Sequence, residues 1–158
     1  MQISTKHSYA ADPASTYAMM TDPEFMNRLV KAVGAEDAEV SSANGRTRIR
    51  AATPAPEQVV RFIGKTLNLD LSITWGEAAA DGSRRGPISA TIDGAPAKLT
   101  GEASMRPGHV GTEVEYTGDF TINIPFLGKQ MEKAAAPYVL KVLDLQQDLG
   151  NTWLAERK

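Results

Sequence analysis

The stretch Val110-Gly-Thr-Glu-Val-Glu-Tyr-Thr-Gly-Asp-Phe-Thr-Ile-Asn-Ile124 decides the fold of this 158-residue chain. Every second residue of it belongs to a mostly apolar face that begins at Val110 and ends at Ile124. The residues between them are polar, among them Glu113 and Glu115. This period of two predicts a long strand with one buried face and one solvent-exposed face.

A long helix is predicted after this strand. Beyond residue 128 the apolar residues recur at steps of three and four, which is the spacing of one stripe along a helix; they are Met131, Ala135, Tyr138, Val142, Leu145, Leu149 and Trp153. Pro137 stands inside the helix and removes a backbone hydrogen bond, so we expect a kink or a restart between Ala134 and Pro137. A long strand that leads into a long terminal helix suggests a curved sheet closed over that helix.

Length and composition narrow the classes of function. A chain of this length fits one domain, residues 1–158, with enough buried surface for a core and a modest cavity. The formal net charge of −2 offers no overall attraction to nucleic acid or to an anionic membrane. The absence of cysteine removes disulfides, thiolate catalysis and cysteine-bound metals. Without a signal peptide or a run of about 20 apolar residues, we expect a cytoplasmic protein with no stable membrane insertion.

Local signals predict the elements before the central sheet. Residues 2–9 alternate in polarity and predict an edge strand. Asp12-Pro13 and Asp22-Pro23 each combine an N-cap aspartate with a proline at the first helical position. These two pairs predict helices over residues 13–20 and 23–33.

Asn44-Gly45 predicts a hairpin with a type I′ turn, in which paired residue numbers sum to 89. This register sets Val40 opposite Ile49 and Ala38 opposite Ala51 on the inner face. Alternation places the arginines of the hairpin on the solvated outer face, which favours a plain surface over an anion site; they are Arg46, Arg48 and Arg50.

The remaining elements follow from the same two periodicities. They are a helical excursion from Pro56 to Gly64, a strand from Leu67 to Trp75, a polar loop from Ala80 to Gly86, a strand from Ile88 to Ile92 and a strand from Ala97 to Met105. Between the last of these and the strand that begins at Val110 we expect a four-residue loop. That loop would set Lys98 opposite Asp119.

This order of elements resembles the START-like superfamily, also called SRPBCC, which includes lipid-transfer domains, polyketide aromatase/cyclases and plant allergen-like binding proteins. Within it the chain is similar to an actinobacterial family of unknown function, through Asp12-Pro13, Asp22-Pro23, Gly111 to Phe120, Ile124-Pro-Phe-Leu-Gly-Lys129 and Gly150-Asn-Thr-Trp-Leu154. The resemblance implies an α+β helix-grip fold: a curved antiparallel sheet of about seven strands wrapped around the C-terminal helix, with a cavity between them. It implies no activity, because members with and without catalysis share this scaffold.

Catalysis in such a cavity would need a titratable side chain at an inward position, and the predicted interior supplies almost none. Its polar-tipped members are Thr47, Trp75, Thr112, Tyr116 and Tyr138. We interpret His7, on the edge-like strand, and His109, beside a turn, as ordinary surface or hydrogen-bonded histidines. With no zinc-binding histidine spacing either, we predict no catalytic residue, no metal site and no cofactor.

Small inward residues leave room either for a closely packed helix or for a ligand, and the sequence favours neither; they are Ala90, Ala97, Gly101, Ala103 and Gly118. Met131 and Tyr138 have the same two interpretations, as core or as cavity lining. We expect Gly118→Leu to block a cavity and spare the fold.

The leading interpretation is a noncatalytic protein that binds a small hydrophobic or amphipathic molecule, such as a lipid, an isoprenoid or a polyketide-like metabolite, between the sheet and the C-terminal helix. The predicted ligand-binding residues are Phe25, Met26, Leu29, Leu71, Ile73, Trp75, Ala90, Leu99, Gly101, Thr112, Val114, Tyr116, Gly118, Met131, Ala135, Tyr138 and Val142. The apolar cover around Phe25 and the Pro56 to Gly64 excursion would form the gate. The alternatives are an aromatase/cyclase-like enzyme and a cavity-free protein-interaction module. Ligand identity and oligomeric state stay open.

Overall fold

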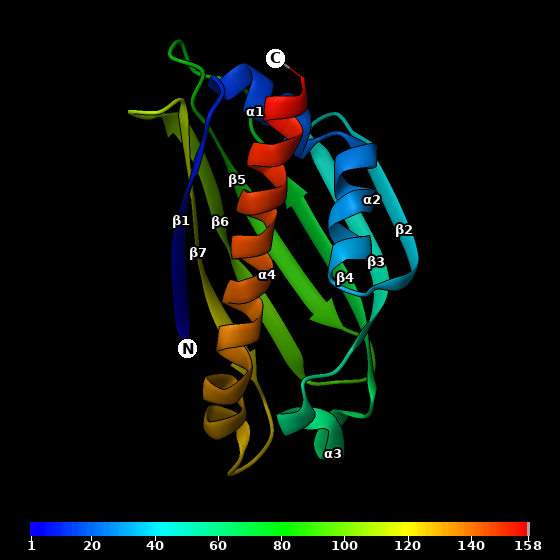
Figure 1. The fold of residues 1–158 in the computed structure, drawn as a ribbon. Helices are drawn as coiled ribbons and strands as arrows, with labels where there is room; N and C mark the ends of the chain where they lie inside the picture. The colour runs from blue at the N-terminus through cyan, green and yellow to red at the C-terminus, as the bar shows by residue number, and fades with distance from the viewer. Residues whose placement is uncertain (158) are drawn as a thin grey trace.

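The computed structural model describes residues 1–157, and these form one seven-stranded antiparallel sheet with helices on one side of it (Figure 1). The elements are β1 (Gln2–Tyr9), α1 (Pro13–Met20), α2 (Pro23–Ala32), β2 (Glu36–Ala43), β3 (Arg46–Pro54), η1 (Glu57–Val59), α3 (Val60–Ile63), β4 (Thr66–Thr74), β5 (Arg84–Ile92), β6 (Ala97–Pro107), β7 (Thr112–Ile122) and α4 (Gly128–Glu156). The strand order is β1-β7-β6-β5-β4-β3-β2. The predicted helix-grip fold, with a curved sheet and a long C-terminal helix, is confirmed.

The two Asp-Pro pairs begin the first two helices as predicted. An Asp12 carboxylate oxygen accepts a hydrogen bond from the backbone nitrogen of Ser15 at 2.8 Å, and Asp22 accepts one from the backbone nitrogen of Glu24 at 2.9 Å. Each carboxylate therefore satisfies a backbone donor that the helix leaves unpaired. These caps fix where the chain turns from β1 into α1 and α2, which cover one end of the sheet (Figure 1).

The Asn44-Gly45 turn closes the β2–β3 hairpin with both residues in the left-handed region, at φ +54° and +80°. Val40 lies opposite Ile49, which is the predicted register. The arginines of β3 point to the outer face as predicted, and the Arg48 guanidinium lies 2.8 Å from the Asp70 carboxylate.

The predicted pair Ala38–Ala51 is wrong. A β-bulge between Glu36 and Glu39 shifts the register at the start of β2. Asp37, inside the bulge, takes a left-handed backbone conformation with φ +53°. The extra residue ends the simple alternation that the prediction extended too far.

The β6–β7 connection has four residues, as predicted, but they are residues 108–111. Lys98 consequently lies opposite Thr121 and not opposite Asp119. Val110 belongs to this loop and is 70% exposed, so its predicted place on the buried face is wrong.

Two further details differ from the prediction, at the start of β5 and at Pro137, whereas the helical excursion ends at Gly64 as predicted. β5 begins at Arg84, inside the predicted polar loop, because Arg84 already pairs with Met105 of β6. The helical excursion is a 3₁₀ turn followed by one α-helical turn, and Gly64 ends it at φ +105°. α4 runs unbroken through Pro137, so no restart occurs there.

Buried side chains form two separate hydrophobic clusters. The upper cluster lies among the sheet, α1, α2 and the C-terminal half of α4; it contains Tyr9, Met19, Met20, Phe25, Met26, Leu29, Val30, Ile49, Ala51, Trp75, Ala103, Met105, Val114, Tyr116, Trp153 and Leu154. The lower cluster joins η1, the far end of β7 and the N-terminal half of α4; it contains Ile3, Val59, Ala97, Phe120, Ile122, Met131, Ala135 and Ala136. Within residues 1–157, no helix is long and apolar enough to span a bilayer.

Candidate functional site

The predicted ligand-binding residues fall into distinct environments. The upper cluster encloses Phe25, Met26, Leu29, Trp75, Val114 and Tyr116, and the lower cluster encloses Met131 and Ala135. Thr112 and Ala90 are buried outside both clusters. Side chains or backbone stay accessible at Leu71, Ile73, Leu99, Gly101, Gly118, Tyr138 and Val142.

Accessible apolar residues from β4, β6 and α4 form what we call the open inner face: Leu67, Leu69, Leu71, Ile73, Leu99, Tyr138 and Val142. Leu67 and Leu69 are partly exposed and belong to neither cluster. Tyr138 and Val142 are 39% and 42% exposed, although helical spacing places them on the same stripe as the buried Ala135. Apolar side chains that face inward are therefore left in contact with solvent.

The position of α4 explains why this face is open. α4 packs against β1 and β7, at one edge of the sheet, and α2 packs against β2 at the other edge (Figure 1). The central strands β4 and β5 lie between these two covers. The side chains of Leu71 and Ile73 extend the upper cluster, whereas those of Leu67 and Leu69 lie beyond it.

Gly101 and Gly118 lie opposite each other in the β6–β7 ladder, and the backbone alone explains their small size. A Cβ atom on Gly101 would lie 2.0 Å from the carbonyl oxygen of Thr117, and one on Gly118 would lie 2.9 Å from that of Thr100. Neither a cavity nor a closely packed helix is needed to account for them. Gly118→Leu would disturb the two strands, so the expectation that it spares the fold is wrong.

A polar cluster lies beneath α4, and we define it as the buried residues His7, Tyr9, Tyr116 and Gln146 together with Asp144, whose side chain is 63% exposed. His7 is 1% exposed, and its Nε2 lies 3.2 Å from an Asp144 carboxylate oxygen. The Tyr116 hydroxyl donates to the Gln146 side-chain oxygen at 3.1 Å. Burial raises the pKa of Tyr9 and of Tyr116 well above the usual tyrosine range, so both remain neutral phenols.

The predicted interior has no histidine, and this is wrong for His7. Of the two interpretations given for His7, a surface residue or a hydrogen-bonded one, the second is confirmed. The alternation of residues 2–9 already places His7 on the same side as Tyr9, so the signal was present. Gln146 precedes Trp153 by seven residues, which puts both on one helix face. His109 lies in the exposed β6–β7 loop.

Several buried polar atoms have no hydrogen-bond partner among residues 1–157: His7 Nδ1, Tyr9 Oη and Trp75 Nε1. The hydroxyls of Thr112 and Tyr116, in contrast, donate to the Ala11 carbonyl and to Gln146. Among the polar-tipped residues predicted for the interior, Trp75 thus has a buried donor without an acceptor. A buried N–H without an acceptor costs about 1–3 kcal/mol, which an acceptor atom at this place would recover.

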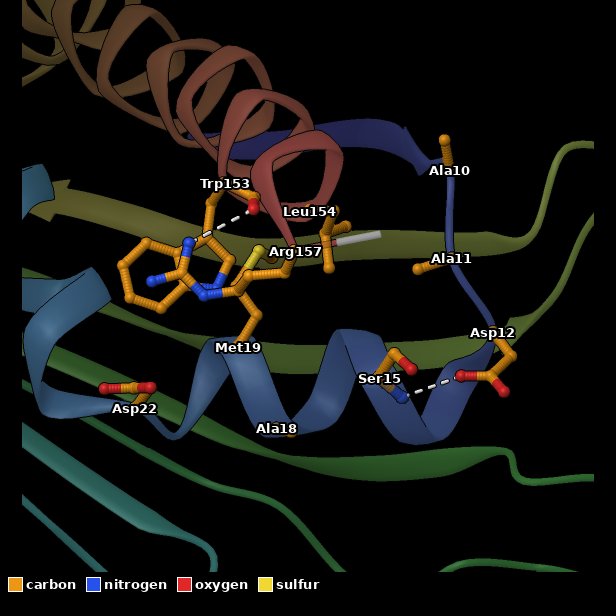
Figure 2. Close-up of a pocket in the computed structure, with 10 residues that line it drawn as sticks. All are labelled: Ala10, Ala11, Asp12, Ser15, Ala18, Met19, Asp22, Trp153, Leu154 and Arg157. Atoms are coloured by element: carbon orange, nitrogen blue, oxygen red, sulfur yellow. Dashed lines mark hydrogen bonds between the residues drawn. The ribbon is translucent and has the colours of Figure 1, made fainter.

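A pocket of about 440 Å³ lies elsewhere, between the β1–α1 connection, α1 and the end of α4 (Figure 2). Its charged side chains already have partners within the protein. Asp12 and Asp22 cap helices, and the Arg157 guanidinium carbon lies 3.2 Å from the centroid of the Trp153 ring. None of the predicted ligand-binding residues lines it; its lining is Ala10, Ala11, Asp12, Ser15, Ala18, Met19, Asp22, Trp153, Leu154 and Arg157.

Metal binding has no support in the described part of the chain, where no three potential ligand side chains of the histidine or carboxylate type gather. The polar cluster contains one histidine and one carboxylate. The contacts within it are hydrogen bonds, between His7 and Asp144 and between Tyr116 and Gln146.

Residues 4–154 match the family described as a protein of unknown function, DUF2505. The chain belongs to this family. No curated protein matches the chain. The DUF2505 family description names no ligand and no reaction, so the function rests on the site itself.

Solved structures with the same fold cover almost the whole chain. A protein from Rhodobacter sphaeroides is 19% identical, with a TM-score of 0.67 and coverage of 99% of this chain and 93% of its own. Protein Ms6760 from Mycobacterium smegmatis is 11% identical, with a TM-score of 0.62 and coverage of 99% and 92%. Ara h 8.0201, a Bet v 1-like protein, is 13% identical, with a TM-score of 0.59 and coverage of 96% and 98%. At these identities the likeness is one of fold alone.

Proposed function

We propose that this protein binds a small hydrophobic or amphipathic molecule, such as a lipid, an isoprenoid or a polyketide-like metabolite, without catalysis. The ligand lies over the open inner face, between β4 and α4. The arrangement of one domain over residues 1–158, the actinobacterial origin and the cytoplasmic location stay predictions of the sequence.

The observation that carries the proposal is the exposure of inward-facing apolar side chains between two well-packed clusters. Leu67 and Leu69 are only partly covered and Val142 is 42% exposed, although each stands at a core position of its element's pattern. A ligand that removes about 300 Å² of apolar surface from water gains about 7 kcal/mol before the cost of its lost freedom. Binding of moderate affinity is expected.

Trp75 supplies the polar contact in this proposal. Its ring belongs to the upper cluster, into which Leu71 and Ile73 continue from the open inner face. Its Nε1 is buried and unpaired. A hydroxyl or carbonyl oxygen at the ligand's inner end accepts this hydrogen bond while the apolar tail lies along β4.

The gate that we propose contains fewer residues than the sequence predicts. Phe25 is 1% exposed and its ring packs edge-on against Trp153, with centroids 5.5 Å apart. Such a residue is part of the core, so we assign the gate to the η1–α3 segment, residues 57–63, which packs beside the N-terminal half of α4.

The test is titration of the purified protein with oleate, farnesol and 1-anilinonaphthalene-8-sulfonate, followed by native mass spectrometry and fluorescence. Leu69→Glu places a charge on the open inner face and should weaken binding at least tenfold. Asn68→Glu places the same charge on the outer face of β4 and should change affinity less than twofold. Equal affinities of these two variants, or no uptake of any probe by the unchanged protein, would contradict the proposal.

The role of Trp75 has its own test. Trp75→Phe keeps an aromatic ring and removes the N–H donor. Farnesol affinity should fall about fivefold, in line with the loss of one hydrogen bond of about 1 kcal/mol. The affinity for farnesene, the hydrocarbon without the hydroxyl, should stay unchanged, and an equal loss for both molecules would assign Trp75 a packing role only.

A second candidate is an aromatase/cyclase-like enzyme, and the contact between the buried His7 and the exposed Asp144 favours it. In an intramolecular aldol condensation, His7 would take a proton from a carbon beside a carbonyl, that carbon would attack a second carbonyl, and water would leave. This candidate ranks lower because the rings of Tyr9 and Tyr116 enclose His7, with centroids 6.4 and 5.8 Å away. Conversion of a linear poly-β-keto ester, lost in His7→Asn, would establish it.

A further inference from the structure

Two aromatic side chains protrude at the lower end of the molecule. Phe62 of α3 is 44% exposed, and Phe126, just before α4, is fully exposed. Their neighbours Ile63 and Leu127 pack against the same lower cluster. Both residues therefore belong to segments at the same end of the fold, α3 and the β7–α4 connection (Figure 1).

The backbone at Phe126 holds its ring outward. Phe126 has φ +67°, a left-handed conformation that is disfavoured for a bulky residue. The ring makes no contribution to either hydrophobic cluster. A large apolar side chain is thus presented to solvent in a fixed position at the start of the longest helix.

Basic side chains belong to the same two segments, and the guanidinium carbon of one of them, Arg61, lies 5.8 Å from the centroid of the Phe62 ring. Arg61, Lys65, Lys129 and Lys133 are all exposed, and none has an ion-pair partner among residues 1–157. The nearby Glu132 carboxylate is already occupied by the terminal amine at 3.2 Å and by the backbone nitrogen of Ile122 at 3.1 Å.

The charge of the chain is therefore divided unevenly. Residues 56–65 and 125–133 together contain four basic and two acidic side chains, a net charge of +2. Because the whole chain has a net charge of −2, the remaining residues have a net charge of −4. The net charge of the whole chain is therefore negative, although residues 56–65 and 125–133 together are positive.

We propose that this aromatic-basic end, made of Arg61, Phe62, Lys65, Phe126, Lys129 and Lys133, docks on an anionic phospholipid surface. The rings enter the headgroup region, and the cations lie over the lipid phosphates. Two rings and four charges give weak, reversible binding. This docking is independent of the function proposed above, because it needs no ligand on the open inner face.

The test is co-sedimentation with vesicles of equal parts phosphatidylglycerol and phosphatidylcholine, compared with pure phosphatidylcholine vesicles. Lys129→Gln should weaken partitioning about fivefold, because one basic residue near an anionic surface usually strengthens partitioning by about this factor. Phe126→Ser should weaken it at least fivefold. Binding to the neutral vesicles should be at least tenfold weaker than to the anionic ones.

Each variant has a matched control at the opposite end of the molecule. Val110→Ser removes an exposed apolar side chain from the loop at the other end of β7. Arg46→Gln removes an exposed cation that has no ion pair within the described residues. Both controls should partition like the unchanged protein, and all variants should show the far-ultraviolet circular dichroism of the folded chain.

Three results would overturn the proposal. They are the absence of binding to anionic vesicles, equal binding to neutral ones, or equal losses in the controls and the Phe126 and Lys129 variants. Concentration-dependent dimerisation that Phe126→Ser abolishes, without vesicle binding, would assign the same surface to a second copy of the chain.

Discussion

The two ends of the inner side of the sheet are built differently. At the upper end, α1, α2 and the last turns of α4 enclose a large cluster, and even His7 and Gln146 are buried there. At the lower end, a smaller cluster joins α4 to η1, and apolar side chains such as Leu69 and Val142 remain accessible. We therefore expect the upper end to contribute most of the stability, and the ligand and the lipid surface proposed above both lie towards the lower end.

The difference in packing between the two ends is tested most directly by truncating one phenylalanine at each end. Phe25→Ala removes a fully packed ring and should lower the free energy of unfolding by about 3–5 kcal/mol. Phe62→Ala removes an exposed ring and should change it by less than about 0.5 kcal/mol. Urea unfolding of both variants measures the difference, and similar losses would mean that the lower end is as tightly packed as the upper one.

A smaller loss is expected from a single methyl group in the C-terminal half of α4. A Cβ atom on Gly150 would lie 2.5 Å from a ring carbon of the buried Tyr9. Gly150→Ala should therefore destabilise the protein by about 1–3 kcal/mol, although alanine is the better helix former by about 1 kcal/mol. Thr152→Ala, exposed two residues later, is the control and should be neutral or slightly stabilising in thermal unfolding. A Gly150→Ala protein that melts higher than the parent would show that Tyr9 is not held in place.

Much of this fold was predictable because its signals are local. Asp-Pro pairs, Asn44-Gly45 and strict alternation each act over a few residues, and the elements they predict are present. The errors arose where pairing with another strand decides the position of a residue. They are the bulge at Asp37, the register at Lys98 and the loop position of Val110.

The candidate site was less predictable for the same reason. Core positions of strands and helices can be read from their periodicity, but which of them stay uncovered depends on where α4 crosses the sheet. Leu71 and Tyr138 were predicted at the site, whereas Leu67 and Leu69, with the same pattern, were recognised only as strand residues. The positive end could not be seen either, because Arg61 and Lys129 are 68 residues apart.

At the lower end, one substitution should increase stability. Phe126→Gly relieves a left-handed backbone and loses no packing, so the free energy of unfolding should rise by about 0.5–1 kcal/mol. Phe62→Gly, inside α3, should instead lower it by about 1 kcal/mol. Denaturant midpoints of the two variants that move in the same direction would contradict this account of the Phe126 backbone.

The smallest effect concerns pH at the upper end. The hydrogen bonds from Ser15 hold the pKa of the Asp12 carboxyl below its usual range. Because the folded pKa lies below the unfolded one, this contribution to stability is present above the unfolded pKa and is lost as the pH falls through the folded pKa. Asp12→Asn keeps an N-cap residue and removes the titration, so its melting temperature should fall less steeply between pH 5 and pH 3. An unchanged slope would show that the Asp12 cap does not contribute to acid sensitivity.

The central claim is that a ligand lies on the open inner face, and methyl chemical shifts report on this directly. In a titration with oleate followed by carbon-13 methyl NMR, the methyl signals of Leu67, Leu69 and Val142 should shift with a common saturation curve. Those of Val30 and Ile49, in the upper cluster, should stay in place. Shifts confined to Met19 and Leu154, which line the pocket of Figure 2, would contradict the claim and move the ligand to the other end of the molecule.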